Sequence, residues 1–296
     1  MREDILTFYK QTSIYTDLGL YSDFAKKLPD DINLLGQLQR KQIIHPYDIG
    51  KFRKNKINNY YYGDMTKIPE IGLVYENDLY PTAIAIIAEL LRRDSSYSFE
   101  RKMEDKLHLC CREQAILLAA ILKAKGYACR VRSGFSNYIK NEVNMDHWIT
   151  EYYNEKESRW ALVDADFHFP DTPFDFNVDD IPRDKFIFGA EAYLGLRTNK
   201  LDPNKFVYAS DPPTIGLKAA LRALFYDFHS LMNNEIIFLH AQKYIVDKDF
   251  VLSETELEEL DNLAKLLLNP DENFDTLQNI WNNTPKYRIL SGGMCD

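Results

Sequence analysis

The fold is decided by the stretch Cys111-Arg-Glu-Gln-Ala-Ile-Leu-Leu-Ala-Ala-Ile-Leu-Lys-Ala-Lys125. Most of these residues are good helix formers, and the next residue, Gly126, is of the type that most often ends a helix. From Ala115 to Leu122 every residue is apolar, so this segment has no face suited to water. The sequence therefore predicts a helix over residues 111–125 that is buried on all sides, as a central core helix.

Three strands are expected to follow this helix, at residues 127–135, 147–153 and 158–164, which are rich in aromatic and β-branched residues. The second and third are joined by a four-residue loop after Tyr153, a length common in hairpins. If Tyr153 pairs with Ser158, His147 faces Asp164 directly on one side of the sheet. Asp166 would lie on the same side, so it remains a rival to Asp164.

These positions suggest a catalytic thiol. Cys111 stands in the first turn of the predicted helix, where unpaired backbone N–H groups and the helix dipole favour negative charge. A thiol there has its pKa lowered from about 8.5, so the thiolate is populated near neutral pH. Arg112 would add to this field. Asp164 would hold one nitrogen of His147 and direct the other at a nucleophile. We therefore expect Cys111 as nucleophile, His147 as base and Asp164 as orienting acid.

The sequence resembles the core of transglutaminase-like enzymes in four consecutive segments: Cys111 to Ala115, Gly126 to Gly134, His147-Trp148 and Trp160 to Asp164. In that family a cysteine opens a buried helix. A Gly-x-x-x-Arg-x-x-x-Gly strand, a His-aromatic strand and a Trp-x-x-x-Asp strand follow it. The resemblance covers about residues 105–168. It implies an α+β fold with a papain/transglutaminase-like core, in which the Cys-bearing helix packs on an antiparallel sheet of at least three strands.

The resemblance also implies an activity. It is that of a cysteine-dependent hydrolase or acyltransferase that acts on an amide bond of a peptide or protein through a thioester, with no cofactor and no metal. The Cys111 backbone N–H would belong to the oxyanion hole. Cys110 stands where the family often has glycine or another small residue, so it remains a second candidate thiol. The acceptor, water or an amine, stays open, as does the choice between protease, amidase and transglutaminase.

Two other functions are compatible with the same residues. Asp164, Asp166 and His168 alternate along the predicted strand and, with His147, would offer ligands to a divalent metal in a metal-dependent hydrolase. A catalytically silent module would instead use the same cleft to bind peptides. Three further histidines lie among apolar residues and are interpreted as core or surface residues: His45, His229 and His240.

The transglutaminase-like core is expected over residues 81–212, between an N-terminal helical extension (1–80) and a C-terminal helical segment (213–296). Helical segments are predicted at 1–60 with a break at Pro29, from Pro81 or Thr82 to Arg93, and at 215–246, 254–269 and 273–282, with a loop at 60–69. Ser253 and Glu256 form a capping box. Residues 166–214 hold six of the twelve prolines and predict a long loop around the core.

Composition narrows the functional class. The 296 residues include 36 basic and 45 acidic residues, a formal net charge of −9 that disfavours nucleic acid as a partner. Four cysteines are too few for a disulfide framework, and they favour a reducing cytoplasm. The longest apolar run, 115–122, is too short to cross a membrane, and the charged N-terminus lacks the features of a signal peptide. The oligomeric state is not indicated.

Overall fold

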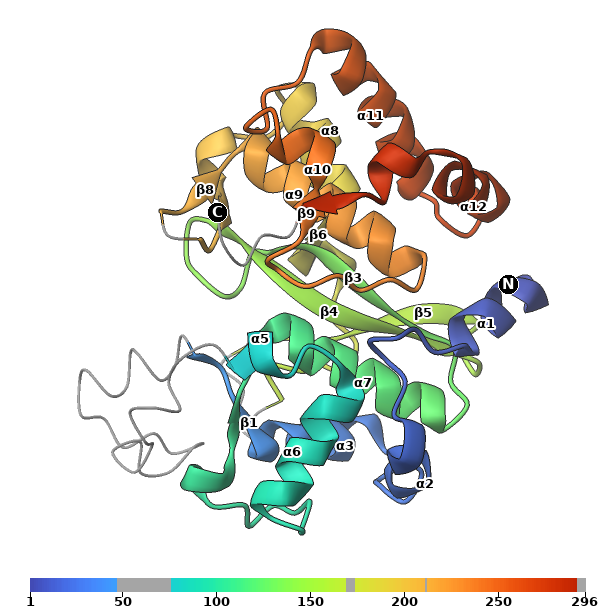
Figure 1. The fold of residues 1–296 in the computed structure, drawn as a ribbon, viewed down its shortest axis with the longest axis vertical. Coiled ribbons are helices and arrows are strands. Elements are labelled where there is room, and N and C mark those ends of the chain that lie inside the picture. Colours follow the sequence, from blue (N-terminus) through green and yellow to red (C-terminus); the bar gives the residue numbers. More distant parts are fainter. Residues whose placement is uncertain (47–75, 169–173, 211, 292–296) are drawn as a thin grey trace. The chain divides into compact units, whose positions relative to one another are not determined.

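The structure is a computed structural model that describes residues 1–46, 76–168, 174–210 and 212–291 (Figure 1). The predicted loop at 60–69 lies outside these residues. The chain divides into two compact units, and we describe each by itself. Unit 1 consists of Met1–Phe8, Arg130–Trp148 and Pro182–Asp296, and unit 2 of Tyr9–Cys129 and Ile149–Ile181.

Helix α7 (Cys111–Ala124) forms the centre of unit 2. Its residues from Cys111 to Lys123 are all buried, and those from Ala115 to Leu122 have no exposed surface. Helices α2 (Ser22–Ala25), α3 (Ile32–Gln42) and α6 (Ala83–Arg93) pack against it (Figure 1). On another side, Thr150 of strand β4 (Asn144–Asn154) donates from Oγ1 to the Ala115 carbonyl at 3.0 Å. The predicted all-round burial is confirmed.

The ends of these helices follow from local chemistry. Gly126 adopts φ +92° after α7, and Tyr127 N–H donates to the Leu122 carbonyl at 3.0 Å, as in a Schellman motif. Thr82 caps α6 by accepting from Ala85 N–H at 3.4 Å, and Asp31 caps α3. The predicted helix stop at Gly126 and the helix start near Thr82 are therefore confirmed.

The remaining elements near the N-terminal side are short. They are α1 (Glu3–Lys10), β1 (Ile43–Ile44), α5 (Glu76–Leu79) and β2 (Leu107–His108), together with 3-10 turns at Gly19–Tyr21 and Met103–Asp105. Strands β1 and β2 pair in parallel, with Ile43 opposite Leu107. Helices α2 and α3 end and begin on either side of Pro29, in agreement with the predicted break. The helical segment predicted over 1–60 is wrong at Ile43–Ile44, because these two residues pair with Leu107 and His108 as a strand.

The hairpin of β4 and β5 (Arg159–Val163) exists, but its predicted register is wrong. Tyr153 pairs with Trp160, two residues further along than Ser158. The cause is the turn: Asn154 remains in the strand and its side chain accepts from Lys156 N–H at 3.1 Å, while Ser158 adopts φ +53°. In this register Asp166, rather than Asp164, corresponds to the position that the prediction placed opposite His147.

Unit 1 is built around helix α9 (Leu217–Leu231). Parts of α1 and β4 also belong to this unit. Its further elements are β3 (Cys129–Ser136), β6 (Phe186–Phe188), α8 (Gly189–Arg197), β7 (Phe206–Tyr208), β8 (Thr214–Ile215), β9 (Ala241–Gln242), α10 (Lys243–Val246), α11 (Glu254–Leu267), α12 (Phe274–Asn283) and β10 (Leu290–Ser291), with 3-10 turns at Arg183–Lys185, Pro203–Lys205 and Pro285–Tyr287. Helix α9 packs against α8 and also contacts β6, β7 and β8. A buried pair stabilises this packing, since Arg132 Nε and Nη2 donate to the Asp227 carboxylate at 2.8 and 2.9 Å.

The prediction of an antiparallel sheet of at least three strands holds only in part, because β4 and β5 are antiparallel but the sheet to which they belong is mixed. Its strand order is β6-β3-β4-β7-β8, in which β4 and β7 run parallel while β3–β6 and β7–β8 are antiparallel. The parallel pair joins Asn144 to Phe206, which are separated by a long connection of the kind that parallel strands require. The α+β class itself is confirmed.

Two further predictions are corrected. Residues 166–214 are not a continuous loop, because they contain α8 and three strands. The sequence of α8 shows no clear helical pattern because it contains Gly189 and Gly195, which are poor helix formers. Packing requires glycine at both positions, since a Cβ would come within 2.3 Å of Ala223 and Leu201 respectively. The helix predicted over 215–246 ends at Leu231, where Asn233 takes a left-handed conformation. The predicted Ser253–Glu256 capping box is confirmed.

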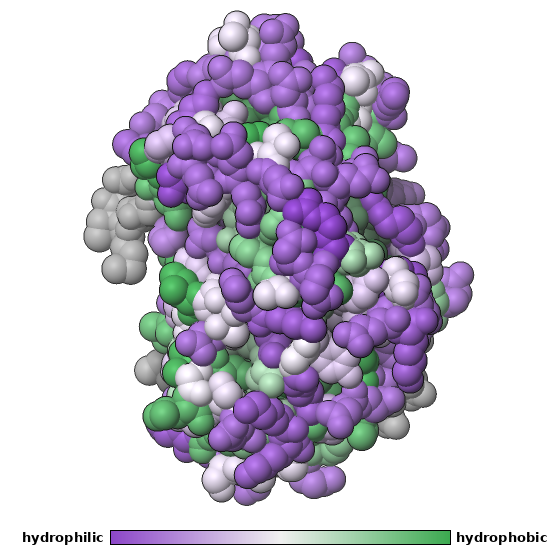
Figure 2. All heavy atoms as spheres, turned by 90° about the vertical axis from the view of Figure 1, so that its right-hand side faces the viewer, coloured by the Kyte–Doolittle hydropathy of each residue, from purple (hydrophilic) through white to green (hydrophobic). Residues whose placement is uncertain are grey.

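The side of the molecule drawn in Figure 2 carries mainly hydrophilic side chains, with hydrophobic residues in small separate patches. Among the helices that the structure describes, none combines the length and the apolar character needed to cross a membrane.

Candidate active site

Cys111 is the first residue of α7. The preceding residue, Cys110, is the N-cap and has extended backbone angles of φ −72° and ψ 175°, and its carbonyl accepts from Gln114 N–H at 3.2 Å. The Cys111 side chain is 7% exposed, whereas Cys110 is half-buried. The thiol of Cys111 therefore lies in the field of a helix N-terminus, inside a largely desolvated environment.

Arg112 adds less to this field than the sequence suggested. Its guanidinium donates from Nη1 to the Glu113 carboxylate at 2.7 Å and lies 5.1 Å from the centre of the Tyr15 ring. Both charged residues are buried. Opposite charges this close largely cancel each other's field at a distance. Burial raises the pKa of Glu113, and the neighbouring Arg112 opposes that shift. Arg112 therefore stands beside Cys111 as one half of an ion pair and not as a lone cation.

Asp164 directly follows the end of β5 and is fully buried. Its Oδ1 accepts from Asp166 N–H at 2.9 Å, and its own N–H donates to the Val178 carbonyl at 2.9 Å. These bonds bend the chain out of the sheet. The prediction that Asp164, Asp166 and His168 alternate along a strand is therefore wrong.

The same turn removes the geometry on which a metal site rested. His168 Nδ1–H donates to the Asp164 carbonyl at 2.5 Å, and its Nε2 contacts the Asp179 carboxylate. Both ring nitrogens are therefore in polar contacts with protein groups. Within the part of the chain that the structure describes, no group of three or more His, Cys, Asp or Glu residues is arranged to hold a metal ion.

Asp166 is bound to helices α7 and α3. Its Oδ1 accepts from Gln114 Nε2 at 2.7 Å and lies 3.5 Å from Arg40 Nη2, while Oδ2 lies 3.8 Å from His45 Nε2. Because both oxygens of Asp166 have partners within unit 2, this carboxylate serves to hold the turn against α7.

His147 lies on β4 in the part of the strand that belongs to unit 1, whereas Cys111 and Asp164 belong to unit 2. The imidazole is 2% exposed and touches the Tyr138 ring edge-on, with centroids 6.2 Å apart; the Phe186 ring centre is 6.5 Å away. Two aromatic rings therefore restrict the access of water to this histidine.

The neighbouring Asp146 faces the other side of β4, as alternate residues of a strand do. Its Oδ1 accepts from Ala209 N–H at 2.8 Å. Burial raises the pKa of Asp146 to about 6, while the Ala209 hydrogen bond and the nearby His147 oppose the shift. Asp146 is thus bound to the loop after β7 and is not placed to orient the imidazole.

Comparisons with protein-family models, with curated proteins and with solved structures find no match to this chain. The candidate site therefore stands on the residue pattern and on the local geometry of each unit.

Sequence reasoning did not identify the polar residues that support Cys111. Gln114 is completely buried one turn along α7, where its amide also donates to the Leu109 carbonyl at 3.2 Å. A polar residue next to an apolar run was the available signal, because a buried amide needs partners. His45, interpreted as an ordinary core or surface histidine, lies beside Asp166. Glu76 and Arg93 bind the backbone of residues 106–108, which lead into α7, and no sequence pattern pointed to them.

Proposed function

We propose that the protein is a cysteine-dependent hydrolase or acyltransferase of transglutaminase-like type. Its substrate would be an amide bond of a peptide or protein, and the reaction would pass through a thioester on Cys111. His147 acts as the base and Asp164 as its orienting acid. The proposal does not require a cofactor.

The reaction has two stages. His147 accepts the proton of the Cys111 thiol, and the thiolate attacks the amide carbonyl carbon. The resulting oxyanion accepts a hydrogen bond from the Cys111 backbone N–H at the start of α7. The C–N bond then breaks, the amine leaves with the proton from His147, and a thioester remains. Water or a second amine, deprotonated by His147, attacks the thioester and releases Cys111.

The observation that carries the proposal is the position of Cys111 as the first residue of helix α7, which is buried from Cys111 to Lys123. A cysteine at a helix N-terminus has a stabilised thiolate. Strands β3, β4 and β5 follow α7 in the order that the transglutaminase-like pattern requires. A structural cysteine has no need of this position, since burial alone would suit it anywhere in the core.

Alkylation kinetics test the proposal. At pH 6, iodoacetamide should label Cys111 at least tenfold faster than Cys129, and His147→Ala should slow the labelling of Cys111 by about tenfold. His240→Ala, in the same unit as His147, is the control and should leave the rate unchanged. Cys110→Ser should also retain fast labelling at Cys111. Equal slow labelling of all thiols, or a rate insensitive to His147→Ala, contradicts the proposal.

One observation favours a second candidate, a catalytically silent peptide-binding module. The register of β4 and β5 differs by two residues from the one that supported the His147–Asp164 pair. A silent module would bind peptides from a library equally well before and after Cys111→Ala, and it would release no product from them. Loss of product release on Cys111→Ala, with binding retained, instead supports the enzyme.

A further inference from the structure

The segment that leads into Cys111 is held by little regular structure. Strand β2 has only two residues and pairs on one edge with the equally short β1. Leu109 N–H extends this ladder by donating to the Ile44 carbonyl at 3.1 Å. A parallel pairing of this length contributes little stability, so other groups must fix the path of the chain up to the N-cap of α7.

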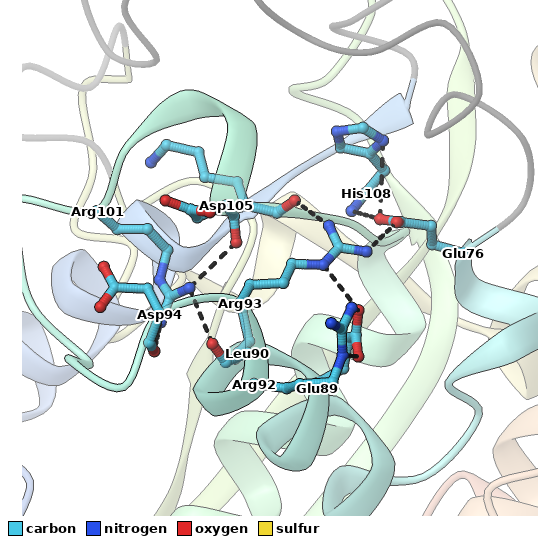
Figure 3. A network of polar contacts seen from close by, with 10 residues as sticks. Glu76, Glu89, Leu90, Arg92, Arg93, Asp94, Arg101, Asp105 and His108 are labelled. Carbon is cyan, nitrogen blue, oxygen red and sulfur yellow. Dashed lines mark hydrogen bonds and ion pairs between the residues drawn. The ribbon is translucent and has the colours of Figure 1, made fainter.

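Two charged side chains bind the backbone of this segment, as Figure 3 shows. Glu76 Oε2 accepts from His108 N–H at 2.6 Å, and its Oε1 pairs with Arg93. Arg93 Nη1 in turn donates to the Lys106 carbonyl at 2.7 Å. The carboxylate therefore occupies a backbone donor of β2 and the guanidinium an acceptor. Together they supply the hydrogen bonds that a neighbouring strand would otherwise provide.

We propose that Glu76 is a positioning residue for Cys111, acting with Arg93 as a clamp on residues 106–108. This inference rests on the proposed function. The path from the clamp to the thiol is short: the Leu109 carbonyl accepts from Gln114 on α7, and Cys110 is the N-cap. Loosening His108 therefore changes where α7 begins, and with it the environment of Cys111.

The charge of Glu76 is needed as well as its shape. Arg93 is shared between two carboxylates, because its Nε also donates to Glu89 Oε1 at 2.9 Å. Without the charge of Glu76, Arg93 keeps its ion pair with Glu89, and Glu89 also pairs with Arg92. The guanidinium then loses its alignment with the Lys106 carbonyl.

The test compares Glu76→Gln with Glu89→Gln in the full-length protein. Glu76→Gln should label with iodoacetamide at Cys111 about fivefold more slowly at pH 6, with the pH profile of labelling moved to higher pH. Amide hydrogen exchange over residues 107–110 should become about tenfold faster. Glu89→Gln removes a similarly buried carboxylate from the same network, but one that holds the segment only through Arg93, so it should change each readout much less than Glu76→Gln does. Arg93→Lys should act in the same direction as Glu76→Gln and serves if that variant does not fold.

The outcomes separate the two proposals. A wild-type Cys111 that labels no faster than Cys129 overturns the proposed function, and the positioning role falls with it. A fast wild-type Cys111 whose labelling rate and pH profile are the same in Glu76→Gln overturns the positioning role alone. A change of equal size in Glu89→Gln does so too, because it would reflect a general loss of stability.

Discussion

Acidification should destabilise unit 1 through His229, a buried histidine on α9. Its Nε2–H donates to the Tyr287 carbonyl at 2.8 Å, and its Nδ1 accepts from Asn234 Nδ2–H at 3.0 Å. Trp281 contacts the ring edge-on, with centroids 4.8 Å apart. Burial lowers the pKa of His229 from 6.5 to about 4, against the opposing effect of the Tyr287 hydrogen bond. The folded protein thus holds this imidazole neutral.

The sign and size of the effect follow from these two values. Between pH 6.5 and 4 the unfolded chain binds a proton that folded His229 does not, so stability falls as the pH falls through this window. At about 1.4 kcal/mol per unit of pKa, the loss approaches ~3 kcal/mol below pH 4 and is ~2 kcal/mol at pH 5. Above pH 7 the contribution of this group is complete and no longer depends on pH.

Urea unfolding of the wild type and His229→Gln, at pH 7.5 and at pH 5, isolates this contribution. The variant should be less stable at pH 7.5, because it loses part of the hydrogen-bonding of the imidazole. The difference in unfolding free energy between the wild type and the variant should be about 2 kcal/mol smaller at pH 5 than at pH 7.5. An NMR titration of the His229 ring should give a midpoint far below that of an exposed histidine. The reasoning would be refuted if the unfolding free energy fell by the same amount between pH 7.5 and pH 5 in both proteins. A titration midpoint of His229 like that of an exposed histidine would refute it too.

Three substitutions probe other features. Burial and the nearby cations Lys41, Arg40 and Arg101 lower the pKa of Lys106 to about 7. Because the unfolded chain binds a proton between pH 7 and 9 that folded Lys106 does not, the unfolding free energy of the wild type should rise by about 2 kcal/mol relative to that of Lys106→Met over this range. The same pH dependence of urea unfolding in both proteins would contradict this. Asp227→Asn leaves the buried Arg132 charge uncompensated and should cost about 3 kcal/mol of unfolding free energy, and a change under about 1 kcal/mol would show that the pair is not structural. Gly126→Ala forces a Cβ into a left-handed conformation and should cost about 1 kcal/mol, measured as a lower melting temperature, whereas an unchanged melting temperature would argue against the helix stop.

The sequence was sufficient where one segment determines its own structure. The apolar run of α7, the Thr82 cap and the Ser253–Glu256 box act within a few residues, so their patterns predicted them correctly. The thiol at the start of α7 belongs to this group. Its place as the first helical residue follows from the sequence pattern of α7.

The sequence was insufficient where distant segments meet. The hairpin register depends on a hydrogen bond within the turn, from Lys156 N–H to the Asn154 side chain. Counting the residues of the loop does not reveal this bond. Strands of two or three residues, such as β2 and β7, are too short to show an alternating pattern. The bond from Glu76 to His108 N–H joins residues 32 positions apart and involves a backbone group, so the identity of His108 gave no sign of it.

The contacts of Glu76 and Arg93 with main-chain atoms affect which substitutions the lead-in segment can accept. An amide N–H and a carbonyl are present in nearly every residue type, so these two hydrogen bonds do not themselves select the residue type at positions 106 and 108. Proline at position 108 is the exception, because it has no N–H to donate. The side chains of Lys106 and His108 are nevertheless buried, and His108 Nδ1 lies 3.7 Å from Glu76 Oε2. Packing therefore limits the side chains that this segment accepts, while the hydrogen bonds of Glu76 and Arg93 limit its backbone. A library randomised at position 108 should return no active sequence with proline.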